Sequence, residues 1–203
     1  MFKKFYNSYL AYVLVYTFYF LSFALFSSLI SVYMLGLGFS AGQTSVVVSV
    51  AFFASMLAQP VMGILNDRLS IKKVTLFSFG AIIFIAIYFM QVRDLLGLTI
   101  GYSLVVMLIN GVNPVMDVLA ARSPYTYGKI RIWGTIGYAL GSQLAGVLYQ
   151  YVSPMAIFIA FIGAMIITIV GVLSIKIRSE SPKSDEVPKT KKDSYISQIL
   201  TNK

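Results

Sequence analysis

The 203-residue sequence contains no cysteine and no histidine. Without cysteine it can form no disulfide and no thiolate metal site, and without histidine it lacks the most common metal ligand and proton relay. Charged residues make up only 11% of the chain, against about 25% in typical soluble domains, whereas 58% of the residues are hydrophobic. No nucleophile–base pair or metal cluster stands out, so an enzyme is not predicted. The composition indicates a polytopic membrane protein.

Hydrophobic runs long enough to cross a bilayer core, which takes about 20 residues, occur six times. They span approximately residues 10–34, 43–65, 74–92, 95–121, 132–152 and 155–175. We therefore predict an all-α membrane protein in which residues 1–177 form a bundle of six transmembrane helices. The first run follows two lysines, as a signal peptide would, but its length and the lack of a clear cleavage site favour a retained helix.

Basic residues are unevenly distributed along the chain. All 16 lysines and arginines except Arg93 lie at the N-terminus, in the loops 66–73 and 122–131, or from Lys176 onward. By the positive-inside rule these regions are cytoplasmic, as are both termini of a six-helix chain in the cell membrane. The net charge of +9 thus reflects topology and not nucleic-acid binding. Residues 178–203 mix both charge signs with two prolines, which predicts a disordered cytoplasmic linker or tail.

Polar residues inside the hydrophobic runs are few and regularly spaced. Asp117 is the only carboxylate within such a run, and an acid there costs about 2.5–3.5 kcal/mol to insert, so it normally has a partner and a task. Helical spacing predicts two polar faces, formed by Asn110, Asn113 and Asp117 in one run and by Arg131, Gly134 and Tyr138 in the next. We predict a polar solute site between these helices, with Gly134 leaving room. The alternative is an ion pair that only holds the two helices together.

Tyrosines repeat along one face of the first run, at positions Tyr9, Tyr12, Tyr16 and Tyr19. Two interpretations are open for this face. One is helix packing with a few hydroxyls near the membrane interface. The other is the wall of a cavity whose deepest members are Tyr16, Tyr19 and Ser22.

Two further patterns concern helix geometry. Pro114 interrupts the run that carries Asp117, and in transporter helices such a proline often marks a bend beside a cavity. Gly137, Gly141 and Ala145 are four residues apart, which predicts close packing of their face against another helix.

The segment 59–73, QPVMGILNDRLSIKK, resembles the loop between the second and third helices of major facilitator superfamily transporters. The matching residues are Gly63, Leu65, Asp67, Arg68 and Lys72. The resemblance implies one half of that fold, a six-helix 3+3 inverted repeat, and a conformational role for Gly63, Asp67, Arg68 and Lys72. Simple anchoring of this loop by positive charge is the alternative.

The stretch from Asn110 to Tyr138 sharpens the resemblance. Within the superfamily, Pro114, Asp117 and the segment YGKIR at 127–131 look like the oligosaccharide:proton symporters of the lactose permease type. There the carboxylate pairs with the arginine, Tyr138 takes the place of a ring that stacks on the sugar, and Asn110 coincides with an asparagine. The segment IRIWGTIGY is equally similar to nucleoside:proton symporters, and PxxD followed by YGxxRxWG to aromatic-acid permeases.

We therefore predict the N-terminal half of a proton-coupled symporter for a small polar solute, in first place a sugar or oligosaccharide. The predicted substrate-binding residues are Asp117, Arg131, Tyr138, Asn110, Asn113, Tyr19 and Ser22. Protons are the expected coupling ion, and no cofactor is expected. A second six-helix half would complete the transporter, either as another polypeptide segment or as a second copy in a homodimer. The alternatives are half of a nucleoside or aromatic-acid symporter, or a non-transporting receptor or assembly fragment.

Overall fold

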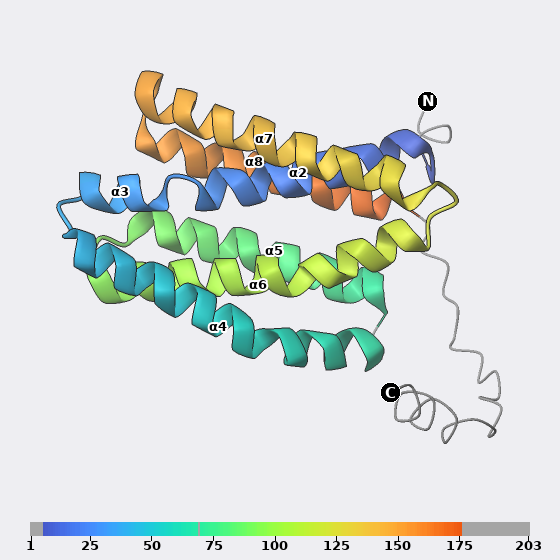
Figure 1. Ribbon diagram of the computed structural model, residues 1–203, viewed down its shortest axis with the longest axis horizontal. Coiled ribbons are helices and arrows are strands. Elements are labelled where there is room, and N and C mark those ends of the chain that lie inside the picture. The colour runs from blue at the N-terminus through green and yellow to red at the C-terminus, as the bar shows by residue number, and fades with distance from the viewer. Residues whose placement is uncertain (1–5, 69, 176–203) are drawn as a thin grey trace, which may run out of the picture.

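The computed structural model describes residues 6–68 and 70–175, without the side chains of residues 66–68. Its helices are α2 (Tyr9–Ser27), α3 (Ile30–Gly36), α4 (Ala41–Arg68), α5 (Ile71–Gln91), α6 (Leu95–Ala121), α7 (Tyr127–Tyr151) and α8 (Pro154–Leu173). The long helices lie side by side and alternate in direction along the chain, with α3 continuing the course of α2 (Figure 1). The predicted tail, 178–203, lies outside the described residues.

Five helical stretches in the described residues are long and hydrophobic enough to cross a membrane. They are Tyr9–Gly36, Ala41–Leu65, Ile71–Gln91, Leu95–Ala121 and Pro154–Leu173. The prediction counted a sixth crossing at 132–152, which corresponds to α7. This helix has 25 residues, which is sufficient length, but charged and polar side chains lower its hydropathy. It packs along α2 and lies parallel to the other long helices (Figure 1).

Helix ends follow local capping more closely than hydrophobicity. The α7 helix begins at Tyr127 and not near residue 132, because helical backbone hydrogen bonding includes the basic residues Lys129 and Arg131, which precede the hydrophobic run. At the start of α4, Ser40 and Gln43 form a reciprocal capping box, with Gln43 N donating to Ser40 Oγ (3.2 Å) and Ser40 N to Gln43 Oε1 (2.9 Å). Asp94 and Ser153 cap α6 and α8 by a single bond each, in which the cap side chain accepts from the backbone N–H of Gly97 and Ala156, respectively.

The predicted first helix, 10–34, is interrupted between α2 and α3. Ser27 Oγ donates to the Phe23 carbonyl (2.8 Å), a side-chain contact that competes with helical hydrogen bonding and often bends helices. Leu29 leaves the helical region at φ −115° and ψ 16°. The first crossing is therefore a helix with a short irregular segment near its far end.

The segment before α2 and the segment after α8 lie next to each other. Asn7 N, just before α2, donates to the Ser174 carbonyl, just after α8, over 2.9 Å. The start of α2 and the end of α8 therefore lie at the same end of the bundle, as six crossings predict. The turns α4–α5 and α6–α7 lie at the same end of the bundle (Figure 1).

Helix contacts reveal a twofold relation between the two halves of the chain. The α2 helix packs chiefly on α7 and α8, and α6 packs chiefly on α4 and α5. Let α2 correspond to α6, α4 to α7, and α5 to α8. The contact of α2 with α7 then corresponds to that of α6 with α4, and the contact of α2 with α8 to that of α6 with α5. This relation is that of two inverted triplets. The predicted 3+3 repeat is confirmed.

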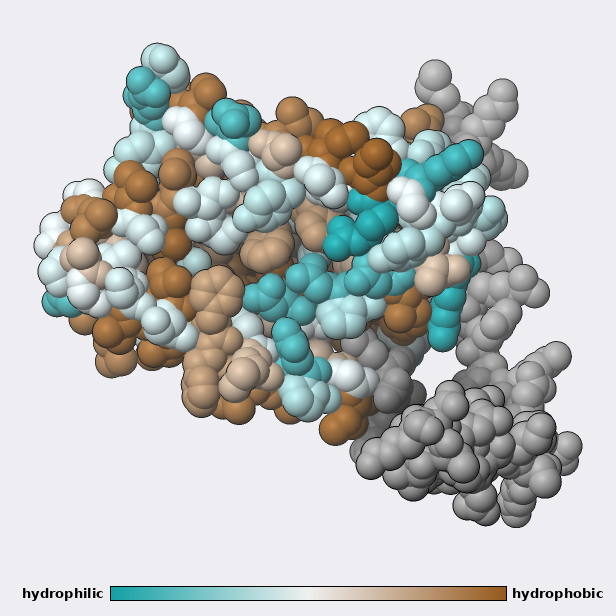
Figure 2. Space-filling view, viewed as in Figure 1, coloured by the Kyte–Doolittle hydropathy of each residue, from teal (hydrophilic) through white to brown (hydrophobic). Residues whose placement is uncertain are grey.

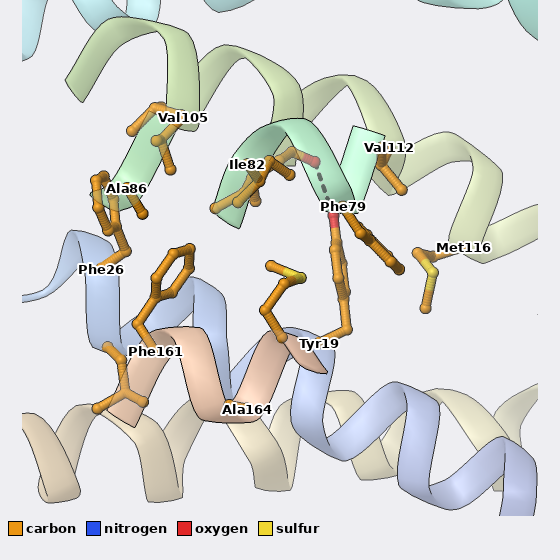
Figure 3. Close-up of a cluster of buried hydrophobic side chains, with 14 of the residues drawn as sticks. Tyr19, Phe26, Phe79, Ile82, Ala86, Val105, Val112, Met116, Phe161 and Ala164 are labelled. Carbon is orange, nitrogen blue, oxygen red and sulfur yellow. Dashed lines mark hydrogen bonds between the residues drawn. The ribbon is translucent and has the colours of Figure 1, made fainter. Parts of the chain in front are cut away.

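Close backbone approach joins α7 to α2. A Cβ on Gly137 would overlap the Thr17 carbonyl, and one on Gly141 would lie 2.5 Å from the Leu21 carbonyl oxygen. The predicted packing role of this small-residue face is therefore confirmed. On the other side of α2, aromatic and aliphatic side chains fill the space toward α5, α6 and α8 (Figure 3).

Candidate functional site

Asp117 and Arg131 meet at the end of the bundle where α6 turns into α7. Arg131 Nε lies 3.2 Å from Asp117 Oδ1, and the two side chains remain 38% and 47% exposed, respectively. Asp117 lies near the C-terminal end of α6 and Arg131 in the second turn of α7, so the short turn 122–126 is sufficient to bring them together. The predicted pair therefore exists, on the surface of the bundle and not within its core.

The ring of Phe20, on α2, lies against the guanidinium of Arg131. Arg131 Cζ lies 4.7 Å from the centroid of the Phe20 ring, within the range of a cation–π contact. A Cβ on Gly134 would lie 2.7 Å from Phe20 Cδ2 and 3.2 Å from Arg131 Nη1. Gly134 thus leaves room for both side chains, as its spacing predicts. Phe20 was not predicted, since only the fold shows that it faces α7.

Tyr138 lies two helical turns beyond Arg131 on α7. It is 41% exposed. Its ring packs edge-to-face with the Phe23 ring, with 5.8 Å between the ring centroids and 79° between the ring planes. Figure 2 shows hydrophilic residues gathered over α6 and α7 on one face of the bundle, toward the end that carries the α6–α7 turn. Tyr138 therefore presents a fixed, partly open aromatic surface on the helix that carries the arginine.

The two amides of α6 are engaged in links between helices. Asn110 Nδ2 donates to Ser55 Oγ on α4 (3.3 Å), and Asn113 Nδ2 donates to Asn110 Oδ1 (3.4 Å). Asn113 Oδ1 in turn lies 3.0 Å from the Tyr19 hydroxyl on α2. This polar chain runs from α2 through α6 to α4. Both asparagines remain partly exposed and lie on the helix of Asp117.

The deeper tyrosines of α2 are fully buried, and they bind the backbone of α6. Tyr19 donates to the Ile109 carbonyl (2.7 Å), and Tyr16 donates to the Met116 carbonyl, so their acceptors lie on either side of Pro114. Figure 3 shows Tyr19 reaching from α2 to α6 beside Phe79. Ser22, also fully buried, donates to the Tyr19 carbonyl (2.7 Å). The structure thus favours helix packing for this face and does not bring Tyr19 and Ser22 to the surface that holds the ion pair.

The motif between α4 and α5 is described only in part. Asp67 and Arg68 end α4, but their side chains lie outside the described part of the chain. Gly63 is exposed, and a Cβ there would meet nothing within 4 Å. Lys72 Nζ donates to the carbonyls of Leu173 (3.0 Å) and Ile175 (3.2 Å) at the end of α8. A lysine in this place satisfies terminal carbonyls and complements the helix dipole, a contact that the sequence did not predict.

Comparison with known proteins agrees with this architecture. The profile of the MFS_1 like family matches residues 9–202. The chain belongs to this family. Membership places it among transporters of the major facilitator superfamily, as the segment 59–73 and the inverted repeat indicate.

Individual relatives are sugar permeases of enterobacteria. The chain is 26% identical to a lactose permease of Citrobacter freundii over 160 residues, which are 73% of this chain and 38% of the relative. It is 28% identical to a sucrose permease of Escherichia coli over 162 residues (73% and 39%) and 29% identical to a raffinose permease of that organism over 133 residues (60% and 31%). The matches thus span 31–39% of the length of these relatives, which are named as permeases and not as enzymes.

Proposed function

We propose that this chain forms the N-terminal half of a proton-coupled symporter for a sugar or oligosaccharide, with Asp117 and Arg131 at the centre of its solute site. The proposal rests on the geometry of this pair. One contact, between Arg131 Nε and Asp117 Oδ1, joins two side chains that are 38% and 47% exposed, respectively. An ion pair that serves only to hold helices together repays its desolvation when further hydrogen bonds satisfy its remaining polar atoms. This pair keeps atoms free on the surface.

The free atoms suit a neutral polyhydroxylated solute. Arg131 pairs through Nε, so that its two Nη groups make no hydrogen bond within the described part of the chain, and neither does Asp117 Oδ2. Adjacent sugar hydroxyls can accept from a guanidinium and donate to a carboxylate. The exposed ring of Tyr138 offers an apolar surface for a sugar ring.

The proposed partner is a second six-helix half. Superfamily transporters place the solute between two halves that rock against each other, and this chain corresponds to about two fifths of its relatives. The open side of Asp117 and Arg131 would then face the other half. Proton coupling is proposed from the resemblance to oligosaccharide:proton symporters, in which the coupling residues lie largely in the second half. A second copy of this chain is the other candidate partner.

Uptake by cells tests the proposed function. The chain is expressed from its natural gene, with any sequence that continues it, and cells are given labelled lactose, raffinose, sucrose, uridine or benzoate. We expect uptake of at least one sugar, accompanied by alkalinisation of the medium as protons enter. Uptake of uridine or benzoate without any sugar would contradict the proposed solute class, and sugar uptake without proton entry would contradict the coupling.

The proposed orientation places the α4–α5 and α6–α7 turns in the cytoplasm of a cell-membrane protein. Because the chain has no cysteine, single replacements can report the exposure of each end. We expect Leu37→Cys and Val152→Cys to react with an impermeant maleimide on intact cells, and Ser70→Cys and Thr126→Cys to react only after lysis. The opposite labelling pattern would overturn the orientation.

A further inference from the structure

Tyr127, the first residue of the YGKIR segment, makes a contact at the ion pair that the sequence did not predict. It is the first residue of α7, and its hydroxyl donates to Asp117 Oδ1 over 3.1 Å. Arg131 Nε approaches the same oxygen at 3.2 Å. Since residues four apart share one face of a helix, Tyr127 and Arg131 reach Oδ1 together from α7.

Two donors on one oxygen constrain how the carboxylate is turned. The terminal torsion of an aspartate is broad when nothing holds it, and a second contact to the same oxygen narrows its range further than one contact does. With Oδ1 held by a hydroxyl and a guanidinium, Oδ2 is left without a hydrogen-bond partner among the described residues. The guanidinium is held in turn by the Phe20 ring, 4.7 Å from Cζ. Acceptor and donors are thereby held in a defined relation before any solute arrives.

We propose that Tyr127 is a positioning residue of the solute site and acts through Asp117. Its hydrogen bond to Oδ1 turns Oδ2 toward the solute and keeps it beside the two Nη groups of Arg131. This inference rests on the proposed function, because it assumes that Asp117 binds the solute. Tyr127 is 43% exposed and contributes little to the core, so its ring is not needed to hold α7 in place.

A double-mutant cycle on sugar binding tests the proposal. Labelled sugar is titrated against membranes that contain the full gene product with Tyr127→Phe, Asp117→Ala or both changes. Removal of the hydroxyl should weaken binding by about 2- to 12-fold, the range that one hydrogen bond contributes. In the Asp117→Ala background the same change should have no further effect, because the acceptor through which Tyr127 acts is absent.

Two controls separate positioning from a structural role. Tyr151→Phe changes a tyrosine that is 73% exposed at the other end of α7, and it should leave binding unchanged. Trp133 is the only tryptophan of the 203-residue chain, and its Nε1 donates to the Tyr9 hydroxyl (2.9 Å). Its emission in the purified chain should be the same with Tyr127→Phe as without it, because the start of α7 is undisturbed.

Each remaining outcome decides the question. If Asp117→Ala weakens binding but Tyr127→Phe does not, the positioning role is wrong and the proposed function stands. If Tyr127→Phe has an equal effect in both backgrounds, or shifts the Trp133 emission, Tyr127 acts independently of Asp117 and the proposal is wrong. If Asp117→Ala leaves sugar binding intact, or no sugar binds at all, the proposed function fails and the positioning role with it.

Discussion

The α6 helix carries two polar regions that differ in what their partners leave free. Around Pro114 the hydroxyls of Tyr16 and Tyr19 are fully buried, and they donate to backbone carbonyls of α6. Near the C-terminal end of the same helix, Asp117 meets Arg131 with about half of each side chain exposed. The first region uses its donors to join helices. Among the described residues, the second leaves Asp117 Oδ2 and both Nη groups of Arg131 without a hydrogen bond, which suits the proposed solute site.

The difference explains why spacing alone cannot assign a role to a polar residue in a membrane helix. Tyr19 and Asp117 both belong to regular helical faces in the sequence, and both were predicted to bind substrate. In the fold, the Tyr19 hydroxyl is fully buried at 2.7 Å from the Ile109 carbonyl, whereas Asp117 Oδ2 is unengaged within the described residues. The predictions below separate residues that hold helices together from residues that remain available to a ligand.

The largest expected effect concerns the glycine contact that holds α7 against α2. Gly137→Ala should lower the free energy of unfolding by about 2–3 kcal/mol, because its Cβ would overlap the Thr17 carbonyl and the backbones would have to separate. Thermal denaturation of the purified protein measures the change. Gly146→Ala on the same helix is the control, since a Cβ there meets nothing within 4 Å. Equal losses for both variants would show that close approach at Gly137 does not stabilise the bundle.

A smaller loss is expected for the buried hydroxyl of α2. Tyr19→Phe should lower the free energy of unfolding by about 1–2 kcal/mol, because a buried hydrogen bond to Ile109 is removed, and should leave sugar affinity unchanged. Tyr88→Phe, on an exposed position of α5, controls for the loss of a hydroxyl as such. A tenfold loss of sugar affinity with normal stability would instead favour the cavity-wall interpretation.

The smallest effect is expected at the end of α8. Lys72→Met removes a donor to the Leu173 and Ile175 carbonyls and should cost about 1 kcal/mol of stability, since this lysine is partly exposed and water can replace it. Lys73→Met, at the exposed neighbouring position, should cost less than half as much. Denaturant titration of both variants measures the difference. Equal stability of the two would remove Lys72 from the contacts that hold α5 to α8.

Much of the architecture was predictable from the sequence because bilayer-spanning helices leave long hydrophobic runs. The close packing of Gly137 and Gly141 against another helix was also predictable, since small residues four apart leave a groove that another backbone can fill. The pairing of Asp117 with Arg131 was predictable from the cost of an isolated acid in lipid and from the family resemblance. The start of α7 at Tyr127 was not predictable from hydropathy, because hydropathy falls at basic residues while helical hydrogen bonding continues through them.

Other contacts depend on tertiary structure that spacing does not encode. Phe20 lies one position beyond Tyr19 in a run rich in aromatic residues, and only the crossing of α2 with α7 places it under the guanidinium. Lys72 could equally have faced lipid headgroups, and it binds α8 because α5 begins where α8 ends. The burial of Ser22 was also not predictable, since periodicity defines a helix face but not what covers it.

The central claim is that Asp117 and Arg131 bind the solute and do not merely join α6 to α7. The most direct measurement is sugar affinity together with melting temperature for Asp117→Asn, Arg131→Gln and the double variant of the full gene product. Each single change should weaken binding by about 10- to 150-fold, because charge-assisted hydrogen bonds to the solute are lost, and the double variant should bind no better than either single variant. Melting temperatures should change little, since the pair is half exposed. Recovery of both binding and melting temperature in the double variant would show that the pair is structural and would contradict the account.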